Sequence, residues 1–391
     1  MKSKARVIAF YLPQYHPIPE NDEVWGKGFT EWTNVGKAKP LFRGHMQPHV
    51  PADLGYYDLR MPEVREQQAQ LAKEAGIEGF CYWHYWFGNG KQLLENIFNE
   101  VVDSGHPDFP FCLGWANHSW STKSWVAGKT MQKDKMIMEQ TYPGQEDNEN
   151  HFYSLLKAFK DNRYIKVDNK LLFVIYMPLA AQNVKQFMDT WNELAKKEGL
   201  LGFHFVGIQD NASIFSFEDN KKYGNQGMVV DAKILYKRVF DLGFDAVNSR
   251  GMALSRIRYD SFVVSIIKEY WSKFLLKVLK WQPVRKYDYK KISQLLFAEE
   301  DAQENVYPTL IPNWDRTPRS GNKAVVWYNY NPKYFYLQVK KALKLIENKQ
   351  DEHKILFLMS WNEWGEGNYM EPDLEYGHGY INALRDALNE D

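Results

Sequence analysis

Eight short β-rich runs, each ending in polar or aromatic residues, alternate with helical patterns along this chain of 391 residues. Such alternation is typical of parallel sheets, because consecutive parallel strands are joined through crossover helices. The runs are Val7–His16, Glu78–Phe87, Phe111–Trp120, Leu171–Pro178, Phe203–Asp210, Phe244–Asn248, Tyr307–Trp314 and Ile355–Trp364. The helical patterns are Met61–Ala75, Gln92–Asp103, Asn148–Lys160, Ala181–Glu198, Pro332–Glu347 and Gly379–Leu388, while Ser213–Asp241 and Arg250–Asn305 show neither pattern clearly.

The number of runs favours a (β/α)₈ barrel over a doubly wound sheet. Runs such as Leu171–Tyr176 are apolar and rich in β-branched or aromatic residues, as strands covered on both faces require. The unusual residues follow the runs, and the functional groups of a barrel sit at the C-terminal ends of its strands. We find no internal repeat, low-complexity tract or linker, so we expect one domain over 1–391 with long loops at Gly26–Asp53 and Ala116–Gln140.

Charge and cysteine content narrow the function classes. The 49 basic and 49 acidic side chains cancel, so no global field favours a nucleic-acid partner. Cys81 and Cys112 lie in apolar runs, which suits buried thiols in a reducing compartment, and we find no signal peptide. No uncharged apolar run reaches the roughly 18 residues that span a bilayer. We therefore expect a soluble, cytoplasmic protein, and the sequence does not indicate its oligomeric state.

Two glutamates at the end of the last run are the predicted catalytic residues. Glu363 and Glu366 lie in the segment Trp361–Gly367, directly after a buried strand. Cleavage of a glycosidic bond needs one carboxyl group to protonate the leaving oxygen and a second to generate or stabilise the nucleophile. Carboxyl groups held close together also have their pKa values pushed apart. The alternative interpretation, solvated surface charge, is opposed by the tryptophans that surround the pair.

Aromatic and polar residues at the other strand ends predict a carbohydrate pocket. Aromatic residues make up 16% of the chain, and sugar rings stack on such rings while amides, histidines and carboxylates bind the hydroxyl groups. Alternate strand residues point into the helical layer, so about half of the rings belong to the core. The predicted substrate contacts, with Arg319 as an anion binder, are Tyr11, Glu31, Trp32, Tyr82, His84, Tyr85, Asn117, His118, Trp120, Gln209, Trp314, Asp315, Arg319, Asn362 and Trp364.

No metal or organic cofactor is expected. His45 and His49 have the spacing of metal ligands, but Pro48 interrupts a helical face and no acidic third ligand is close in sequence. The motifs of phosphate loops, dinucleotide sites, serine hydrolases and zincins do not occur. Phe262–Trp281 alternates apolar residues with lysines, a pattern of a helix that packs on the barrel or lies on a membrane surface. On a membrane, the substrate would be lipid-linked.

Several blocks of the chain resemble the WbsX family, which is related to the endo-α-mannosidases of glycoside hydrolase family 99. These blocks are Ile8–His16, Gly28–Val35, Gly79–Phe87, Trp314–Arg319, and Trp361–Gly367 followed by Glu371 and Pro372, and the similarity runs from Arg6 to nearly the C-terminus. The resemblance implies a (β/α)₈ barrel, no metal, and hydrolysis or transglycosylation of α-linked, mannose-like glycans with retention of configuration.

The resemblance also implies roles for the two glutamates. Glu363 would deprotonate the 2-hydroxyl of the sugar, which attacks the anomeric carbon, and Glu366 would act as acid and then base. Family 99 has His where this chain has Gly365, so one substrate contact is missing. WbsX proteins are also described as glycosyltransferases of surface-polysaccharide biosynthesis. No D-x-D pair occurs, which leaves a metal-independent transferase as the first alternative and a non-catalytic carbohydrate-binding barrel as the second.

Overall fold

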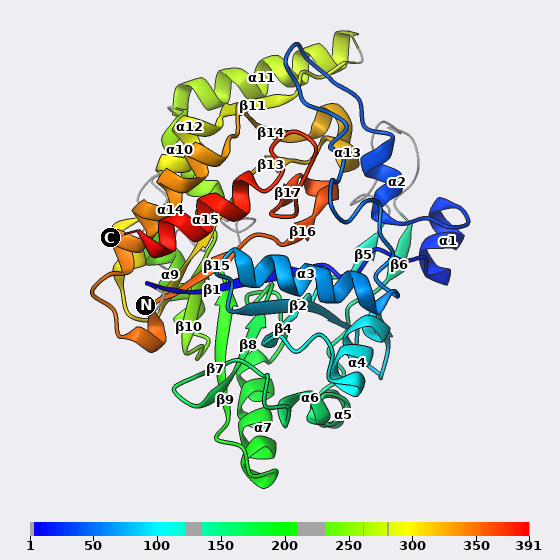
Figure 1. Cartoon of the computed structure of the whole chain (residues 1–391), viewed down its shortest axis with the longest axis vertical. Helices are drawn as coiled ribbons and strands as arrows, with labels where there is room; N and C mark the ends of the chain where they lie inside the picture. Colours follow the sequence, from blue (N-terminus) through cyan, green and yellow to red (C-terminus); the bar gives the residue numbers. More distant parts are fainter. Residues whose placement is uncertain (1–3, 122–134, 210–230, 261, 280, 391) are drawn as a thin grey trace.

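The predicted (β/α)₈ architecture is confirmed: eight parallel strands close into one barrel (Figure 1). The computed structural model describes residues 4–121, 135–209, 231–260, 262–279 and 281–390. In barrel order, the strands are β1 (Arg6–Tyr11), β2 (Gly79–Trp86), β4 (Phe111–Trp115), β8 (Lys170–Ile175), β9 (Phe203–Ile208), β10 (Ala246–Ser249), β12 (Val306–Leu310) and β15 (Ile355–Leu358). The first strand pairs with both β2 and β15, which leaves the barrel without an open edge.

The barrel interior is a packed core in which aromatic rings fill much of the space. Residues Leu171–Ile175 of β8 are buried throughout, as expected for a strand covered on both faces. The ring of Phe10 stacks on Trp83 with centroids 4.7 Å apart and on Phe357 at 5.2 Å. Such rings fill a cylinder that aliphatic side chains alone would leave loosely packed. Substrate can therefore enter only at an end of the barrel.

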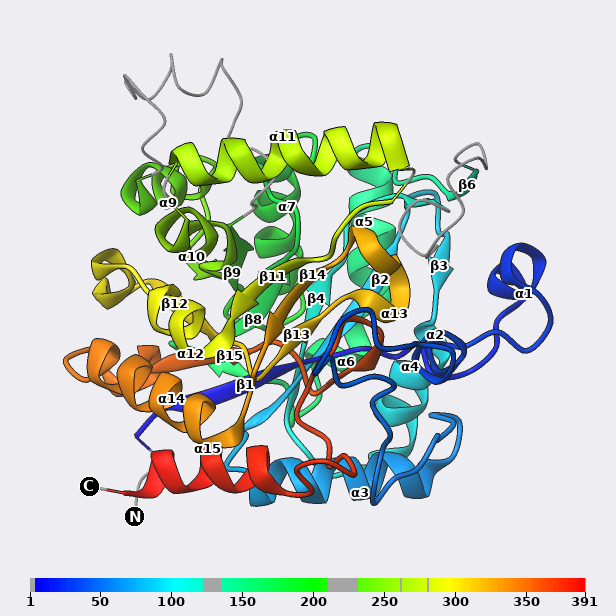
Figure 2. The same cartoon turned by 90° about the horizontal axis from the view of Figure 1, so that it is seen from above.

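Helices surround the barrel, with α3 and α15 along one side and α11 along the opposite side in Figure 2. The helices that connect or cover the strands are α3 (Pro62–Glu74), α4 (Glu95–Ser104), α5 (Gln145–Ser154), α6 (Leu156–Phe159), α7 (Val184–Lys197), α9 (Ala232–Phe240), α10 (Met252–Tyr259), α14 (Pro332–Ile346) and α15 (Gly379–Asn389). Amphipathic spacing explains α7, which buries Phe187, Trp191 and Leu194 against the barrel.

The predicted helices are present with small differences. The expected helix at 92–103 begins at Glu95, because Gln92–Leu93 pair with β2 as the short strand β3. The expected helix at 148–160 is two helices, α5 and α6. The unassigned segment at 250–305 contains α10, α11 (Phe262–Leu279), β11 (Arg285–Asp288) and α12 (Tyr289–Ile292). Of the unassigned segment at 213–241, residues 213–230 lie outside the described residues, and the rest contains α9.

Segments outside the barrel shape its C-terminal end. Between β1 and α3 lie α1 (Pro19–Trp25) and, within the first long loop, α2 (Glu31–Gly36). A second sheet joins β11 to β14 (Val325–Tyr328) and β13 (Trp314–Asp315), and α13 (Thr317–Ser320) follows β13 directly. The remaining short strands are β5 (Trp120–Ser121), β6 (Met136–Met138), β7 (Lys166–Val167), β16 (Asn362–Glu363) and β17 (Asn368–Tyr369). Part of the predicted loop Ala116–Gln140, at 122–134, lies outside the described residues.

The two cysteines lie opposite each other on neighbouring strands. Cys81 of β2 is in register with Cys112 of β4, and both are buried free thiols. Within the described residues, no helix combines the length and the apolar character needed to cross a membrane.

Candidate active site

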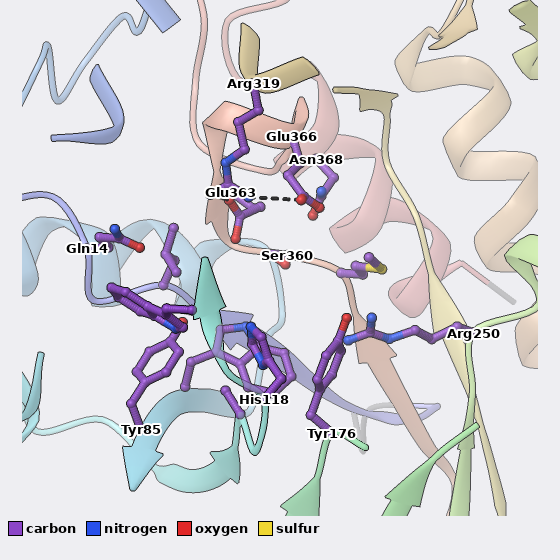
Figure 3. A pocket seen from close by; sticks show the side chains of 15 residues that line it. Gln14, Tyr85, His118, Tyr176, Arg250, Arg319, Ser360, Glu363, Glu366 and Asn368 are labelled. Atoms are coloured by element: carbon purple, nitrogen blue, oxygen red, sulfur yellow. Dashed lines mark hydrogen bonds and ion pairs between the residues drawn. The ribbon is translucent and has the colours of Figure 1, made fainter. Parts of the chain in front are cut away.

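A pocket opens at the C-terminal end of the barrel, with about 640 Å³ of empty space, part of it open to solvent. Figure 3 shows the side chains that meet there. They are Leu12, Gln14, Trp83, Tyr85, Ala116, His118, Trp120, Tyr176, Arg250, Arg319, Met359, Ser360, Glu363, Glu366 and Asn368.

Hydrogen bonds to the residues that follow β1 hold the segment that carries Glu363 and Glu366. The Asn362 side chain accepts a hydrogen bond from the Leu12 amide at 2.8 Å and donates one to the Leu12 carbonyl at 3.0 Å. The Tyr15 hydroxyl accepts from the Trp364 amide at 3.0 Å. A short 3₁₀ turn at Trp364–Glu366 then brings both glutamates to the same side. Glu363 and Glu366 therefore line the same pocket, as two cooperating carboxyl groups must.

A single guanidinium group links three carboxylates at this site. Arg319 of α13 contacts Glu363 through Nη2 at 2.6 Å and Glu366 through Nη1 at 2.8 Å (Figure 3). Its Nε contacts Glu31 of α2 at 3.1 Å. Arg316 contacts Glu366 at 2.9 Å. Charge-assisted bonds of this kind are strong when water is excluded. The network fixes the separation and orientation of the two pocket glutamates.

The absence of a side chain at position 365 makes room for Glu31. The Glu31 side chain is fully buried, and its Oε2 lies where a Cβ of residue 365 would stand. The same Cβ would lie 2.9 Å from Arg319 Nε. Gly365 is thus required by the close approach of a third carboxylate, in the position where the sequence resemblance led us to expect a lost substrate contact.

The two pocket glutamates differ in proton affinity. Burial raises the pKa of Glu363 to about 8, with Arg319 opposing and Glu366 adding to the rise. Burial would also raise the pKa of Glu366, but Arg316 and Arg319 outweigh it and hold that pKa below the usual range. In the empty site at neutral pH, one proton therefore resides on Glu363 while Glu366 is ionised. A pair with separated pKa values is what acid–base catalysis needs.

Six of the predicted site residues line the pocket: Tyr85, His118, Trp120, Arg319, Glu363 and Glu366. Burial lowers the pKa of His118 to about 4, so its imidazole is neutral and suited to hydrogen bonding with hydroxyl groups. Arg319, predicted as an anion binder, is instead occupied by protein carboxylates. The other predicted contacts are not lining residues of this pocket.

The alternation of side chains along a strand explains why two of the predicted contacts, Tyr82 and His84, do not line the pocket. Tyr82 and His84 lie on the outer side of β2, where Tyr82 packs on Phe98 of α4 and His84 contacts His151 of α5. Their neighbours Trp83 and Tyr85 point inward and line the pocket.

Other predicted contacts brace the surrounding structure. The Asn117 side chain donates to the Met177 carbonyl at 3.0 Å and accepts from the Met177 amide at 2.8 Å. Trp32 donates to the Tyr57 carbonyl, and Trp364 donates to Glu371 at 2.6 Å. The remaining residues of this group are Tyr11, which donates to Gln68, Trp314, which packs on Trp327, the buried Gln209, and Asn362.

Asp315 joins the two histidines that the sequence singled out. Its Oδ2 lies 2.7 Å from His45 Nε2 and 3.9 Å from His49 Nε2, and it also accepts from Gln47 at 2.7 Å. Burial opposes ionisation of Asp315, but the hydrogen bonds from His45 and His49 prevail and hold its pKa well below the usual range. Within the described residues, no group of three or more histidine, cysteine or acidic side chains is arranged to hold a metal ion. Asp315 thus anchors the first long loop to β13.

The sequence interpretation missed two buried amides, Gln14 and Asn368. Both are fully buried and line the pocket, and their side-chain oxygen and nitrogen atoms have no hydrogen-bond partner among the described residues. A buried amide without partners is costly, so these groups are suited to bind a polar ligand. Tyr176 and Arg250, which directly follow β8 and β10, were also missed, although a search of the first residue after each strand would have found them.

Comparisons with known proteins agree with this architecture. A family model described as "Glycosyltransferase WbsX" matches residues 7–384. "Uncharacterized protein WxcX" of Xanthomonas campestris pv. campestris is 30% identical over 385 residues, which cover 98% of this chain and 50% of the relative. The chain therefore spans about half the length of the curated relatives it matches.

Two solved structures share the fold. A "Glycoside hydrolase-like protein" aligns with a TM-score of 0.56 and 15% identity, covering 99% of this chain and 94% of that chain. The GH99 endo-alpha-mannosidase from Bacteroides thetaiotaomicron, in complex with bis-tris-propane, aligns with a TM-score of 0.53 and 13% identity, covering 98% of this chain and 96% of the other. At these identities the comparison concerns the fold.

The raised pKa of Glu363 predicts a pH-dependent stability change. Between its ordinary value of 4.5 and about 8, the folded protein keeps a proton that the unfolded chain releases, so this residue makes stability fall as pH rises. Glu363→Gln removes that dependence. The melting temperature of the variant relative to wild type should increase from pH 5 to about pH 8 and level off above it. Exposed Glu193 provides the control Glu193→Gln, and equal pH dependence for the two variants would contradict the prediction.

The close approach at position 365 predicts energetic coupling with Glu31. Gly365→Ala should cost roughly 1–3 kcal/mol, the usual penalty for an added group in a packed site. In a Glu31→Ser background, where the overlapping oxygen is absent, the same substitution should cost clearly less. Urea unfolding of the four proteins measures both costs. Equal costs in the two backgrounds would show that Glu31 is not what excludes a side chain there.

Proposed function

The chain belongs to the WbsX family, and from that premise we propose that it is a retaining glycoside hydrolase or transglycosidase that acts on α-linked, mannose-like glycans. The observation that carries the proposal is the pair Glu363 and Glu366, held by Arg319 in one pocket at the C-terminal end of the barrel. Retention and the mannose-like substrate rest on the resemblance to family 99.

The pocket composition supports a sugar as ligand. Trp83, Tyr85 and Trp120 offer ring faces or edges, and Gln14 and Asn368 offer four unpartnered polar atoms for hydroxyl groups. We propose that the whole of 1–391 works as one catalytic barrel. We place it in the cytoplasm on the evidence of the buried thiols Cys81 and Cys112.

We assign the base to Glu363 and the acid to Glu366, as the resemblance implies. With a pKa of about 8, Glu363 holds a proton at neutral pH, so it acts as the base only after that proton has left. Glu366, whose pKa the neighbouring guanidinium groups lower, must take up a proton to act as the acid, so the assigned roles require the proton to pass to Glu366 when substrate binds. A pH profile does not separate this order from its reverse, because an interacting pair shows only two macroscopic pKa values. The dependence of each variant's rate on the leaving group separates the two assignments.

The decisive experiment measures hydrolysis of aryl α- and β-glycosides and oligosaccharides without metal or nucleotide sugar. Glu366→Gln should lower kcat/KM for substrates with poor leaving groups by roughly 10²–10⁴-fold and spare kcat/KM for those with good leaving groups, whose bond-breaking step needs no acid. Glu363→Gln should lower both alike. The exposed Glu193→Gln is the control. The opposite pattern would reverse the assignment, and no turnover of any substrate would reject the hydrolase.

A metal-independent glycosyltransferase of surface-polysaccharide biosynthesis is the second candidate, and the description of the family model favours it. Product formation only when a sugar nucleotide and an acceptor are supplied would establish it. Sugar binding without any turnover, unaffected by Glu366→Gln, would instead indicate a carbohydrate-binding barrel.

We further propose that α11 rests on an anionic membrane surface and that the substrate is lipid-linked. Tyr270 and Trp271 of α11 are 72% and 56% exposed. Helical spacing gathers them with exposed Ile267, Phe274 and Val278 on one face, whereas Ser272 is buried on the side toward the protein. Aromatic and aliphatic side chains in one stripe are typical of helices that lie in the interface of a bilayer.

Charge supports the same orientation. Phe262–Trp281 contains four lysines and one glutamate, and Lys273 and Lys277 are exposed beside the apolar face. Each basic residue near an anionic surface contributes about 1 kcal/mol. Lys268 is bound to Asp260 at 2.7 Å and lies over the Tyr287 ring, which fixes the helix on β11 with the stripe outward.

Vesicle sedimentation tests the membrane proposal. The protein should bind vesicles of phosphatidylcholine with phosphatidylglycerol more tightly than phosphatidylcholine alone, and added salt should weaken binding. Trp271→Ser with Phe274→Ser should reduce binding roughly tenfold, whereas Leu201→Ser with Leu337→Ser, at exposed apolar positions elsewhere, should not. Unchanged binding, or a protein dimer that the first pair abolishes, would contradict it.

A further inference from the structure

The wall of the pocket opposite Arg319 carries another guanidinium group, that of Arg250. Arg250 directly follows β10 and lines the same pocket as Glu363 and Glu366. In Figure 3 its side chain extends from the side of β10 toward Tyr176, across the pocket from Arg319. Only 9% of the residue is exposed, so solvent does little to stabilise its charge.

Aromatic rings surround this guanidinium group. Its central carbon lies 4.9 Å from the ring centroid of Tyr176, 5.7 Å from that of Phe10 and 6.0 Å from that of Trp83. Cation–π contacts with three rings orient the group and offset part of the cost of burial. They leave its N–H donors available, because ring faces do not accept conventional hydrogen bonds.

Arg250 differs from Arg319 and Arg316, the two arginines that contact the pocket glutamates, in having no carboxylate partner among the described residues. Arg319 and Arg316 are both within 3.1 Å of acidic side chains. Arg250 makes no ion pair or hydrogen bond there, and its Nε is buried without an acceptor. Its positive charge acts on Glu366 only over a longer range, as one of the influences that lower the Glu366 pKa.

We propose that Arg250 is an anion-binding subsite and that the natural substrate carries an oxyanion next to the bond that reacts. A buried, oriented cation without an internal partner is stabilised when a ligand supplies the missing charge. Its planar fork matches the two oxygens of a carboxylate or of a phosphate. The aromatic collar around it would hold the sugar ring that bears the anion.

The oxyanion has two chemical sources, and each corresponds to one of the candidate functions. A carboxylate would belong to a hexuronic acid within an acidic polysaccharide, and this reading rests on the proposed glycosidase. A phosphate would belong to an activated sugar donor, as the transferase requires. Binding measurements separate the two without relying on turnover, so failure of the glycosidase would leave the subsite testable.

The experiment measures equilibrium binding by saturation-transfer NMR and calorimetry. Methyl α-hexuronides are compared with the matching neutral methyl α-hexosides, which differ only at the C6 carboxylate, and uridine diphosphate and inorganic phosphate form the second arm. Wild type should bind the hexuronide, or the phosphate-bearing ligands of the second arm, at least roughly tenfold more tightly than the neutral hexoside, as expected for charge-assisted hydrogen bonds at a buried site. Preference in the first arm assigns an acidic sugar, and preference in the second assigns an activated donor.

Variants of Arg250 test whether the preference belongs to this residue. Arg250→Gln should abolish the preference while keeping the binding of neutral glycosides. Arg250→Lys keeps the charge and loses the planar guanidinium fork, so it should retain part of the preference for the charged ligand. This variant keeps the test valid if Arg250→Gln does not fold. Arg256→Gln, at a buried arginine outside the pocket, is the matched control. The proposal is overturned when no charged ligand is preferred, or when Arg250→Gln shows the same preference as wild type.

Discussion

The contact of Arg319 with three carboxylates, of which Glu31 and Glu363 are buried, is the interaction on which the pocket end of this barrel depends. It joins the first long loop, through Glu31, to the segment after the last strand, through Glu363 and Glu366, and α13 supplies the guanidinium group. The three acidic groups raise the pKa of Arg319, against the effect of burial, so its charge is secure. Without it, three carboxylates would lie together in a site with little water, which would force protonation or separation. The charge of Arg319 therefore lets the three carboxylates lie close together where little water reaches them.

Much of the fold could be predicted because its signals are local. Each parallel strand is a short apolar run, and each C-terminal end is marked by polar or aromatic residues such as Trp115 and Glu363. The period of two along a strand is equally local. Applied to β2, it separates inward Trp83 and Tyr85 from outward Tyr82 and His84, a distinction that counting aromatic residues does not make.

The partners of the polar residues could not be predicted, because they are distant in the chain. Asp315 meets His45 across 270 positions, and Asn362 meets Leu12 across 350. These residues are of types that often bind ligands, but here they form hydrogen bonds within the protein. Conversely, nothing in the sequence around Arg250 marks it, and its proposed role depends on its having no ion-pair partner among the residues that the structure describes. Sequence identifies the residue types at the mouth of the barrel, whereas only the structure shows which are occupied.

Closure of the barrel has a consequence for biosynthesis. Among the strands of the barrel, β1 comes first in the sequence and β15 last, yet the two pair along one edge. The edge of β1 must remain unpaired during most of translation, and the two pocket glutamates emerge only after β15. Their positions depend on Leu12 and Tyr15, so the site takes shape when the ends of the barrel meet. The pocket with its two glutamates is therefore assembled only once β15 has paired with β1.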